Sequence, residues 1–568
     1  MRSSTAAWWR DAVIYQLYVR SFQDTDGDGV GDLQGVISRL DYLRETLGVD
    51  AVWLTPFYRS PMFDSGYDVQ DHTEVDPGYG ELSTFDELVA RAHDVGLKVL
   101  LDFVATNTSD QHAWFLESRS SRANAKREWY IWRDPKPDGS PPNNWLAMWG
   151  GPAWTLDPTT GQFFLHAFSP RIPDLNWHNP EVGQAMLDAA AFWLDRGVDG
   201  FRVDAVPMLL KDALLRDNPV STSPSAGLHK PMGPYGAQQH VHDSGDPGIH
   251  AILRELRSLL DSYGEPERVM VGEVHATEWT DWATYYGSAL DELHFPFNFG
   301  LMHVATNPTS VREVIKASSA AVPAGAWPNF VLGNHDEHRV ASRAGAELTP
   351  VLMMLLLTLR GTPTIYYGDE LGLPDVLIRP EDVRDPWELG VPGLGLGRDP
   401  QRSPMPWTGD PNGGFCPPHI RPWLPLIEHH SSRSVAAQLD RPGSMLSLTR
   451  RLLGLRRVRE ELRSGSQSPW AAPDTCVAYL REHAGQRSLI ALNFSDHSAR
   501  IRLPTPGRGH IIGSTNTERE GAKAKESIEL APYEGCLVEL AGAGAVQPVP
   551  SSITAHTRGE DYPRSHWR

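Results

Sequence analysis

The segment Gly200-Phe201-Arg202-Val203-Asp204-Ala205 decides the fold, because its apolar residues predict a buried strand that ends in a single carboxylate. Val271-Gly272-Glu273, Asn334-His335-Asp336 and Leu101-Asp102-Phe103-Val104 repeat this arrangement elsewhere in the chain. An unpaired buried charge is costly and is usually retained for use. We therefore interpret these strand ends as parts of one functional site.

Eight short apolar, β-branched runs recur along the chain, and helical patterns separate most of them. This alternation is expected of a parallel sheet, and eight units predict an α/β fold, the (β/α)8 or TIM barrel. The active site of such a barrel lies at the C-terminal ends of its strands, where the acids fall. The predicted strands are Val13 to Val19, Val49 to Pro56, Leu97 to Val104, Val198 to Val206, Arg268 to Val274, Leu293 to Phe299, Asn329 to Asn334 and Thr364 to Tyr367. The predicted helices include Leu33 to Leu47, Thr84 to Val95, Pro180 to Arg196 and Ile249 to Tyr263.

Two interruptions and a change of pattern divide the chain further. Residues 106–179, rich in Trp, Pro, Gly and Asn, are too many for a loop and predict an inserted subdomain after the third strand. The barrel therefore comprises residues 1–105 and 180–465, with a Pro/Gly/Trp-rich rim insertion at about 375–425. Short alternating strands predict a C-terminal antiparallel β-sandwich over 466–542. The Ala/Gly/Pro/Ser-rich tail, 543–568, is expected to be disordered.

The composition limits the partners. A formal charge of -19 over 568 residues argues against nucleic acid and anionic membranes, which such a surface repels. The three cysteines, Cys416, Cys476 and Cys536, suggest neither a disulfide framework nor a zinc site. We find no apolar leader before Trp8 and no run of about 18 apolar residues. We predict a cytoplasmic protein, a monomer or small homo-oligomer, that acts on a small neutral substrate.

The acids fit the cleavage of glycosidic bonds. Cleavage with retention needs two carboxyl groups about 5 to 5.5 Å apart, one a nucleophile and the other an acid that becomes a base. Asp204 is the candidate nucleophile, because Arg202 favours its ionised form, and Glu273 is the candidate acid/base, because a nearby anion or an apolar wall would raise its pKa. Asp336, beside His335, is a candidate for binding sugar hydroxyls and stabilising an oxocarbenium-like transition state. The alternative is that these acids form structural ion pairs at the strand ends.

The loop Asp24-Thr25-Asp26-Gly27-Asp28-Gly29-Val30-Gly31-Asp32 is a candidate metal site. Carboxylates at alternate positions with Gly at the sixth are similar to an EF-hand loop, but Gly35 stands where that loop carries a bidentate Glu. We predict a compact structural Ca²⁺ or Mg²⁺ site, and the alternative is a solvated acidic turn. The predicted ligands are Asp24, Asp26, Asp28, the Val30 carbonyl and Asp32.

Two segments have the polar and aromatic residues of a pocket rim. Gly66-Tyr67-Asp68 follows the second predicted strand, and Gly397 to Trp407 follows the eighth. An Asp and an Arg from these rims could pair and close the pocket behind a terminal sugar, which favours exo action. The tryptophans of the insertion fit either a pocket lining or a core.

As a set, these motifs resemble the α-amylase family, glycoside hydrolase family 13, and within it the α-glucosidase and oligo-1,6-glucosidase branch. The resemblance covers roughly Trp8 to Leu540 and includes Tyr15 to Phe22. It implies a barrel with an inserted B domain after strand 3, a C-terminal antiparallel β domain and a double-displacement retaining mechanism. It implies Asp204 as nucleophile, Glu273 as acid/base and Asp336 as transition-state stabiliser. The substrate contacts it implies are Tyr67, Asp68, Asp102, Asn107, Arg202, His335 and Arg402.

Details of this resemblance bear on specificity. In such enzymes the residue after the nucleophile resembles a linkage switch, Val accompanying α-1,6 bonds and a smaller residue α-1,4 bonds. Here it is Ala205, and Ile172 stands where the oligo-1,6 branch usually has Gln, so both lean toward α-1,4 or broad specificity. Where the family reads Asp-x-Val-x-Asn-His, this chain has Thr106 for the Asn and Asn107 for the sugar-contacting His. That departure puts efficient hydrolysis of ordinary glucosides in question, and a transferase branch of the family also lacks this histidine.

We therefore expect a retaining α-glucosidase that releases terminal non-reducing glucose from short oligosaccharides or glucosides, with some transglucosylation. A glucosyltransferase or trehalose-forming isomerase of the same fold is the nearest alternative. A catalytically inactive sugar-binding or scaffold protein is another, against which the intact Asp204, Glu273 and Asp336 argue.

Overall fold

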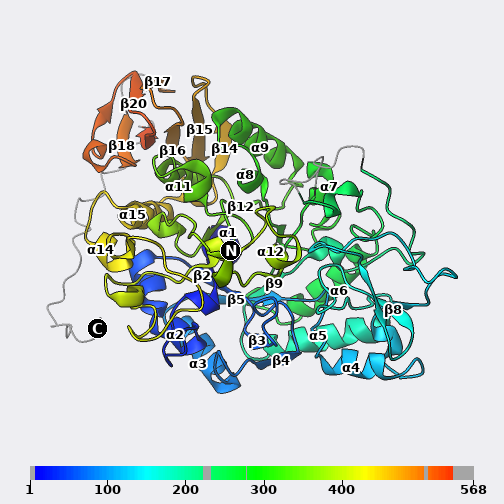
Figure 1. The fold of residues 1–568 in the computed structure, drawn as a ribbon. Coiled ribbons are helices and arrows are strands. Elements are labelled where there is room, and N and C mark those ends of the chain that lie inside the picture. Colours follow the sequence, from blue (N-terminus) through cyan, green and yellow to red (C-terminus); the bar gives the residue numbers. More distant parts are fainter. Residues whose placement is uncertain (1–6, 222–231, 277, 505–508, 541–568) are drawn as a thin grey trace.

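The computed structural model describes residues 7–221, 232–276, 278–504 and 509–540. Its centre is an eight-stranded sheet in the order β11-β10-β9-β5-β2-β1-β13-β12, in which all paired strands are parallel (Figure 1). This sheet is the predicted (β/α)8 barrel, and each strand lies within its predicted run except β13, which begins two residues earlier. The strands are β1 (Ile14–Leu17), β2 (Ala51–Leu54), β5 (Lys98–Phe103), β9 (Gly200–Val203), β10 (Val269–Gly272), β11 (Phe295–Pro296), β12 (Asn329–Val331) and β13 (Thr362–Tyr366).

Helices pack outside the sheet, and one of them differs from the prediction. A single helix over Leu33 to Leu47 is wrong, because α2 ends at Ser38 and a π-helical turn, η2 (Tyr42–Leu47), follows. At the break the Arg39 N–H bonds to the Val36 carbonyl, three residues back, so the regular ladder stops. The helices are α1 (Trp8–Asp11), α2 (Leu33–Ser38), α3 (Leu82–Asp94), α5 (Pro180–Leu194), α6 (Ile249–Asp261), α7 (Trp279–Thr284), α8 (Gly300–His303), α9 (Pro308–Ala321), α10 (Val340–Ala344), α11 (Thr349–Thr358), α12 (Pro386–Gly390), α13 (His430–Arg433), α14 (Val435–Leu439), α15 (Met445–Val458) and α16 (Glu460–Arg463).

The segment between β5 and β9 carries its own small fold. It contains α4 (Ala113–Ser120) and a three-stranded antiparallel sheet, β6-β8-β7 (Trp132–Arg133, Gln162–Leu165, Trp154–Asp157). Trp145, Trp154 and Phe163 form a separate buried cluster there, so tryptophans of this insertion are core residues. A hairpin, β3 (Tyr58–Arg59) and β4 (Asp71–Val75), follows β2.

The C-terminal strands form antiparallel sheets with their own core (Figure 1, orange to red). A six-stranded sheet runs β14-β15-β16-β21-β18-β19, and β17 pairs with β20. The sequence did not predict β14, which is polar and mostly exposed, or β18 and β19, which contain Gly and Lys. The predicted tail, 543–568, lies outside the described residues. The strands are β14 (Ser466–Pro469), β15 (Cys476–His483), β16 (Gln486–Asn493), β17 (Ala499–Arg502), β18 (Gly509–Ser514), β19 (Lys523–Ala524), β20 (Ser527–Leu530) and β21 (Gly535–Leu540).

Two glycines allow the barrel strands that carry the acids to pack closely. A Cβ on Gly200 would lie 2.0 Å from the Val269 carbonyl oxygen, and one on Gly272 would lie 2.3 Å from Leu293 Cδ1. Neither position has room for a side chain, so Gly200 allows β9 to lie close to β10, and Gly272 allows β10 to lie close to the segment that leads into β11. In the described part of the chain, no helix has the length and apolar character needed to cross a bilayer.

Candidate active site

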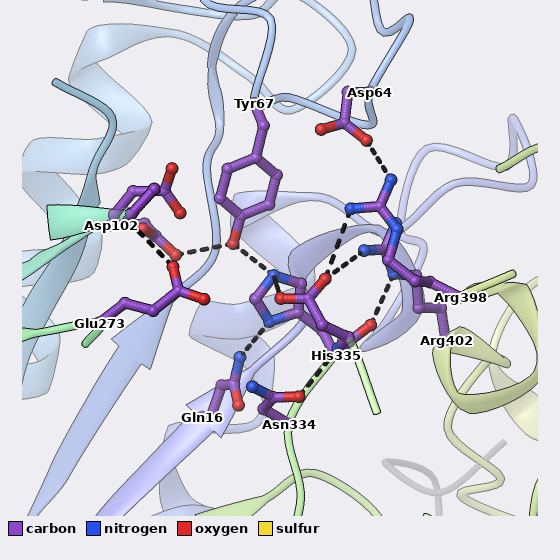
Figure 2. Close-up of polar contacts among 12 residues, drawn as sticks. Gln16, Asp64, Tyr67, Asp102, Glu273, Asn334, His335, Arg398 and Arg402 are labelled. Atoms are coloured by element: carbon purple, nitrogen blue, oxygen red, sulfur yellow. Dashed lines mark hydrogen bonds and ion pairs between the residues drawn. The ribbon is translucent and has the colours of Figure 1, made fainter. Parts of the chain in front are cut away.

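The predicted acids meet at the C-terminal ends of the barrel strands (Figure 2). Asp102 is the last but one residue of β5, while Asp204 and Glu273 directly follow β9 and β10. Asp336 follows β12 after a short loop. Neighbouring parallel strands end at the same edge of the barrel, so residues far apart in sequence converge there.

Arg202 is the shared partner of three of these acids. Its Nη1 donates to Asp102 Oδ1 at 2.6 Å and to Asp204 Oδ1 at 2.7 Å, and its Nη2 donates to Glu273 Oε2 at 2.6 Å. The Ala205 N–H donates to the same Glu273 oxygen at 3.0 Å. One guanidinium therefore holds the nucleophile and acid/base candidates close together.

Exposure separates the acids that can meet a ligand from those beneath them. The side chains of Asp204, Glu273 and Asp336 keep 12%, 10% and 23% of their surface accessible. The side chains of Arg202 and Asp102 are almost fully buried. The three candidate catalytic carboxylates thus form the accessible layer, and Asp102 and Arg202 support it.

His335 is held from both ring nitrogens, which fixes its tautomer. Gln16 Nε2 lies 2.7 Å from His335 Nδ1, and the Tyr67 hydroxyl lies 2.7 Å from His335 Nε2. Tyr67 donates its hydroxyl proton to Asp102 Oδ2 at 2.8 Å, so we assign the His335 proton to Nε2, with Nδ1 accepting from Gln16. Burial lowers the pKa of His335 to about 3, which keeps the ring neutral. Tyr67 also stacks on His335 at 5.2 Å between ring centroids.

Two arginines of the second rim bind Asp336. Arg402 Nη2 donates to Asp336 Oδ1 at 3.0 Å, and Arg398 Nη1 lies 3.4 Å from the same oxygen. Arg398 also pairs with Asp64 at 2.6 Å and with Asp385 at 2.6 Å. The rims therefore do pair through an Asp and an Arg, as Figure 2 shows for Asp64 and Arg398.

The rim aspartate in this pair is Asp64, four residues before the one we named. Asp68 is fully buried, and its carboxylate accepts from the Ser60 hydroxyl and from the Phe63 and Asp64 N–H groups. These bonds hold the loop that carries Asp64. In this structure Asp68 shapes the rim, and its contact with a sugar stays a prediction.

Asn107 and Thr106 are both buried, and Asn107 contacts Tyr67. Asn107 Nδ2 donates to the Tyr67 carbonyl at 3.2 Å, and the Thr106 hydroxyl oxygen is buried with no hydrogen-bond partner among the described residues. The amide of Asn107 is thus engaged with the backbone of the rim.

The pKa values of Asp204 and Glu273 are shifted in directions that the sequence did not predict. Burial raises the pKa of Asp204 well above its ordinary value. Arg202 acts to lower this pKa, whereas the carboxylates of Glu273 and Asp102 raise it further. Burial would also raise the pKa of Glu273, but Arg202 and the hydrogen bond with His275 outweigh it and lower that pKa. The sequence predicts the opposite, a low pKa for Asp204 beside Arg202 and a raised pKa for Glu273. Because both carboxylates share Arg202, they titrate as one unit.

The pKa values of Asp102 and Asp336 are also shifted in opposite directions. Burial raises the pKa of Asp102 to about 6 against its contacts with Arg202 and Tyr67. Burial would also raise the pKa of Asp336, but His335, Arg398, Arg402 and Arg202 outweigh it and lower that pKa. Asp336 therefore stays ionised.

The acidic loop gathers three of its predicted metal ligands. Oxygens of Asp24, Asp26 and Asp28 lie within 4.8 Å of one another. Burial raises the pKa of Asp24, and the neighbouring Asp28 and Asp26 add to this against two backbone N–H groups, so the donor set suits a hard cation. Asp32 does not join the group, because its carboxylate caps α2 by accepting from the Gly35 N–H.

The sequence missed several residues of the site. His275 contacts Glu273, Gln16 contacts His335, and Asp64 and Asp385 contact Arg398. For His275 a signal existed, since it lies two residues after Glu273. Gln16 and Asp64 contact residues more than 300 positions away in the sequence. Asp385 lies in the rim insertion, whose sequence has no regular pattern.

Comparison with known proteins assigns this site to a family. The model of the alpha-amylase catalytic domain matches residues 16–465. This chain belongs to the α-amylase family. A probable alpha-glucosidase of Rhizobium meliloti (strain 1021) is 42% identical over 527 residues, which cover 90% of this chain and 95% of the relative. An oligo-1,6-glucosidase of Heyndrickxia coagulans is 34% identical over 574 residues, covering 94% of this chain and 99% of the relative.

A solved structure supports the same assignment for this α-amylase family member. The crystal structure of the alpha-glucosyl transfer enzyme XgtA is similar with a TM-score of 0.88 and 40% identity, over 94% of this chain and 100% of that one. The resemblance to the α-glucosidase and oligo-1,6-glucosidase branch is thereby confirmed, and this family member is a glycoside hydrolase.

Proposed function

We propose that this glycoside hydrolase is a retaining α-glucosidase that releases terminal non-reducing α-linked glucose, α-1,4-linked by preference, from short oligosaccharides or glucosides. The observation that carries the proposal is the pair of accessible carboxylates, Asp204 and Glu273, on one guanidinium. A shared guanidinium favours a short distance between the two carboxyl groups, about 5 to 5.5 Å as in retaining enzymes. Inverting enzymes have a longer distance, which leaves room for a water molecule.

The two steps follow from this pair. In the first, an Asp204 oxygen attacks the anomeric carbon while Glu273 gives its proton to the glycosidic oxygen, which leaves as an alcohol. In the second, Glu273 takes a proton from water, whose oxygen displaces Asp204 from the anomeric carbon. Retention results because each step inverts the anomeric centre once.

The reaction needs a proton on Glu273 before Asp204 attacks the sugar. Both carboxylates contact Arg202 and titrate together, so the first step requires the form of the pair in which Glu273 carries the proton. Asp336 remains ionised and offers a negative charge to the oxocarbenium-like transition state.

The paired rims support action on chain ends. Arg398 and Arg402 converge on Asp336, and Arg398 also bonds to Asp64 across the two rims. A pocket closed on this side accepts one terminal sugar and stops a chain from continuing. The names of the relatives, an alpha-glucosidase and an oligo-1,6-glucosidase, agree with such substrates.

Glucosyl transfer is a second candidate. The similar solved structure is that of an alpha-glucosyl transfer enzyme, XgtA, and Asn107 stands where the family pattern has a histidine. In that reaction a sugar hydroxyl takes the place of water in the second step, with the same proton transfer to Glu273.

We also propose that Asp24, Asp26 and Asp28 hold a structural Ca²⁺ or Mg²⁺ ion. Such an ion would neutralise three converging carboxylates and stiffen the loop after β1. It takes no part in the steps above, because the loop is separate from the acid network on Arg202.

Product analysis tests the function. The purified protein is incubated with maltose, isomaltose, trehalose, sucrose and an aryl α-glucoside, with and without excess acceptor sugar. Release of α-glucose from maltose, read by NMR before mutarotation, supports the proposal. Conversion of maltose to trehalose, or transfer with no glucose released, would favour the alternatives, and no turnover of any substrate would refute the glucosidase.

A further inference from the structure

The two oxygens of Glu273 have different surroundings. Oε2 accepts from Arg202 Nη2 at 2.6 Å and from the Ala205 N–H at 3.0 Å. Oε1 lies 3.0 Å from His275 Nε2. Because two donors already face Oε2, the proton of the acid form belongs on Oε1, next to the imidazole.

The His275 ring is held in place from the other side. It stacks on Phe299 with 4.6 Å between ring centroids and an angle of 19°, and on His303 with 5.6 Å and 18°. Both partners come from α8 or its N-cap. The side chain of His275 is 43% exposed, so its ring connects the carboxyl of Glu273 with solvent.

We propose that His275 is a positioning residue that fixes Oε1 of Glu273 toward the leaving group and sets the pH range over which Glu273 acts as the acid. This inference rests on the proposed role of Glu273. With Glu273 ionised, His275 Nε2–H donates to Oε1. With Glu273 protonated, the Oε1–H donates to Nε2, and the imidazole proton lies on Nδ1.

The sign of the effect follows from the charges around the pair. His275 is faced by Glu273 on the β10 side and by His303 on α8, while Arg202 and Asp336 act on Glu273 from farther inside the site. A donor at Oε1 favours the carboxylate, so His275 lowers the pKa of Glu273. Loss of the imidazole therefore extends acid catalysis to higher pH.

Two variants separate the hydrogen bond from the stacking. His275→Phe keeps a ring for Phe299 and removes the nitrogen that bonds to Glu273. His275→Gln keeps a neutral donor at that place without a group that titrates. His303→Phe is the matched control, because it changes the same ring stack and leaves the His275 nitrogen beside Glu273 in place.

The test is the pH profile of kcat/KM, from about pH 4 to 9, for maltose and for an aryl α-glucoside with an activated leaving group. We expect the basic limb for maltose to move up by about half to one pH unit in His275→Phe, the size of one hydrogen bond. His275→Gln should restore the basic limb toward that of the wild type, because its amide can donate to Oε1. The aryl substrate should shift less, because it needs little proton assistance.

The outcomes separate the two proposals. An active wild type whose basic limb is unchanged in both His275 variants overturns this inference alone, and so does an equal shift in His303→Phe. A wild type that turns over no α-glucoside overturns the proposed function and this inference together.

Discussion

Replacing Glu273 by Gln should separate proton transfer from structure. The amide oxygen can take the place of Oε2 and accept from Arg202 and the Ala205 N–H, now 2.6 and 3.0 Å away, while the amide NH₂ faces His275. The variant therefore keeps these contacts and loses only the acidic proton. General acid catalysis contributes about 10²- to 10⁴-fold, or about 2.7 to 5.4 kcal/mol.

The assay compares two leaving groups. For maltose, whose leaving alkoxide needs the proton, kcat/KM should fall by about 10²- to 10⁴-fold. For an aryl α-glucoside with an activated phenol, kcat/KM should fall less than about tenfold, and the glucosyl enzyme should accumulate as an initial burst of phenol, because its hydrolysis needs a base. Asp204→Asn is the contrasting control, since no group replaces the nucleophile and both substrates should lose activity together. Equal losses on both substrates in Glu273→Gln, without a burst, would refute the assignment of the acid.

Four further changes test other parts of the molecule. Chelation should lower the melting temperature by a few degrees and added Ca²⁺ should restore it, if the ion binds only the folded loop at Asp24; a melting curve that chelator and Ca²⁺ leave alone would remove the site. Ala205→Val should raise the isomaltose-to-maltose ratio of kcat/KM within the range of about 1 to 3 kcal/mol, and should lower stability because Ala205 has φ 41°, which disfavours a β-branched side chain; an unchanged ratio would place specificity elsewhere. Thr106→Asn with Asn107→His should raise kcat/KM about tenfold on an aryl α-glucoside and lower it on a 6-deoxy or 6-substituted analogue, since one hydrogen bond of about 1.4 kcal/mol is at stake; identical values for both proteins would sink the idea. Burial lowers the pKa of His72 to about 4, so the folding stability that its neutral ring contributes is fully present above pH 6.5 and is lost as the pH falls toward 4, at up to about 1.4 kcal/mol per pH unit. In urea titrations the free energy of unfolding should therefore fall less steeply with decreasing pH in His72→Phe than in the wild type, and parallel curves would contradict this.

The strand ends were predictable because parallel barrel strands bury both faces. Each acid after such a run stands out against a continuous apolar background, as Asp204 and Glu273 do. The barrel order then follows from chain order, so the approach of these two residues needed no further information. Patterning of this kind predicts where a site lies and which acids it contains.

Loop contacts were not predictable in the same way. The motif Gly66-Tyr67-Asp68 marked a rim, but backbone N–H groups satisfy Asp68 and leave Asp64 to meet Arg398 across the pocket. Asp32 likewise has the spacing of a metal ligand, yet the open N-terminus of α2 takes its carboxylate. In both cases a nearby backbone donor competes for the side chain, and sequence spacing does not show which partner wins.

The shared role of Arg202 was not predictable from the sequence for a related reason. From the sequence, Arg202 is next to Asp204 and appears to serve it alone, whereas in the fold it serves Asp102, Asp204 and Glu273 at once. The share that each carboxylate receives depends on its other donors, and for Glu273 these include His275.

The active site holds more carboxylates than guanidinium groups, and this excess of negative charge favours the transition state of the reaction. Arg202 faces three acids, and Arg398 and Arg402 meet Asp336 while Asp64 and Asp385 also contact Arg398. Burial raises the pKa of Asp64 to about 7 and that of Asp102 to about 6 against the neighbouring arginines, and nearby carboxylates add to the rise, so the excess of negative charge is unfavourable in the resting site. A sugar that develops positive charge at its anomeric carbon relieves the excess, whereas the neutral substrate does not, so the field of the site favours the transition state over the ground state.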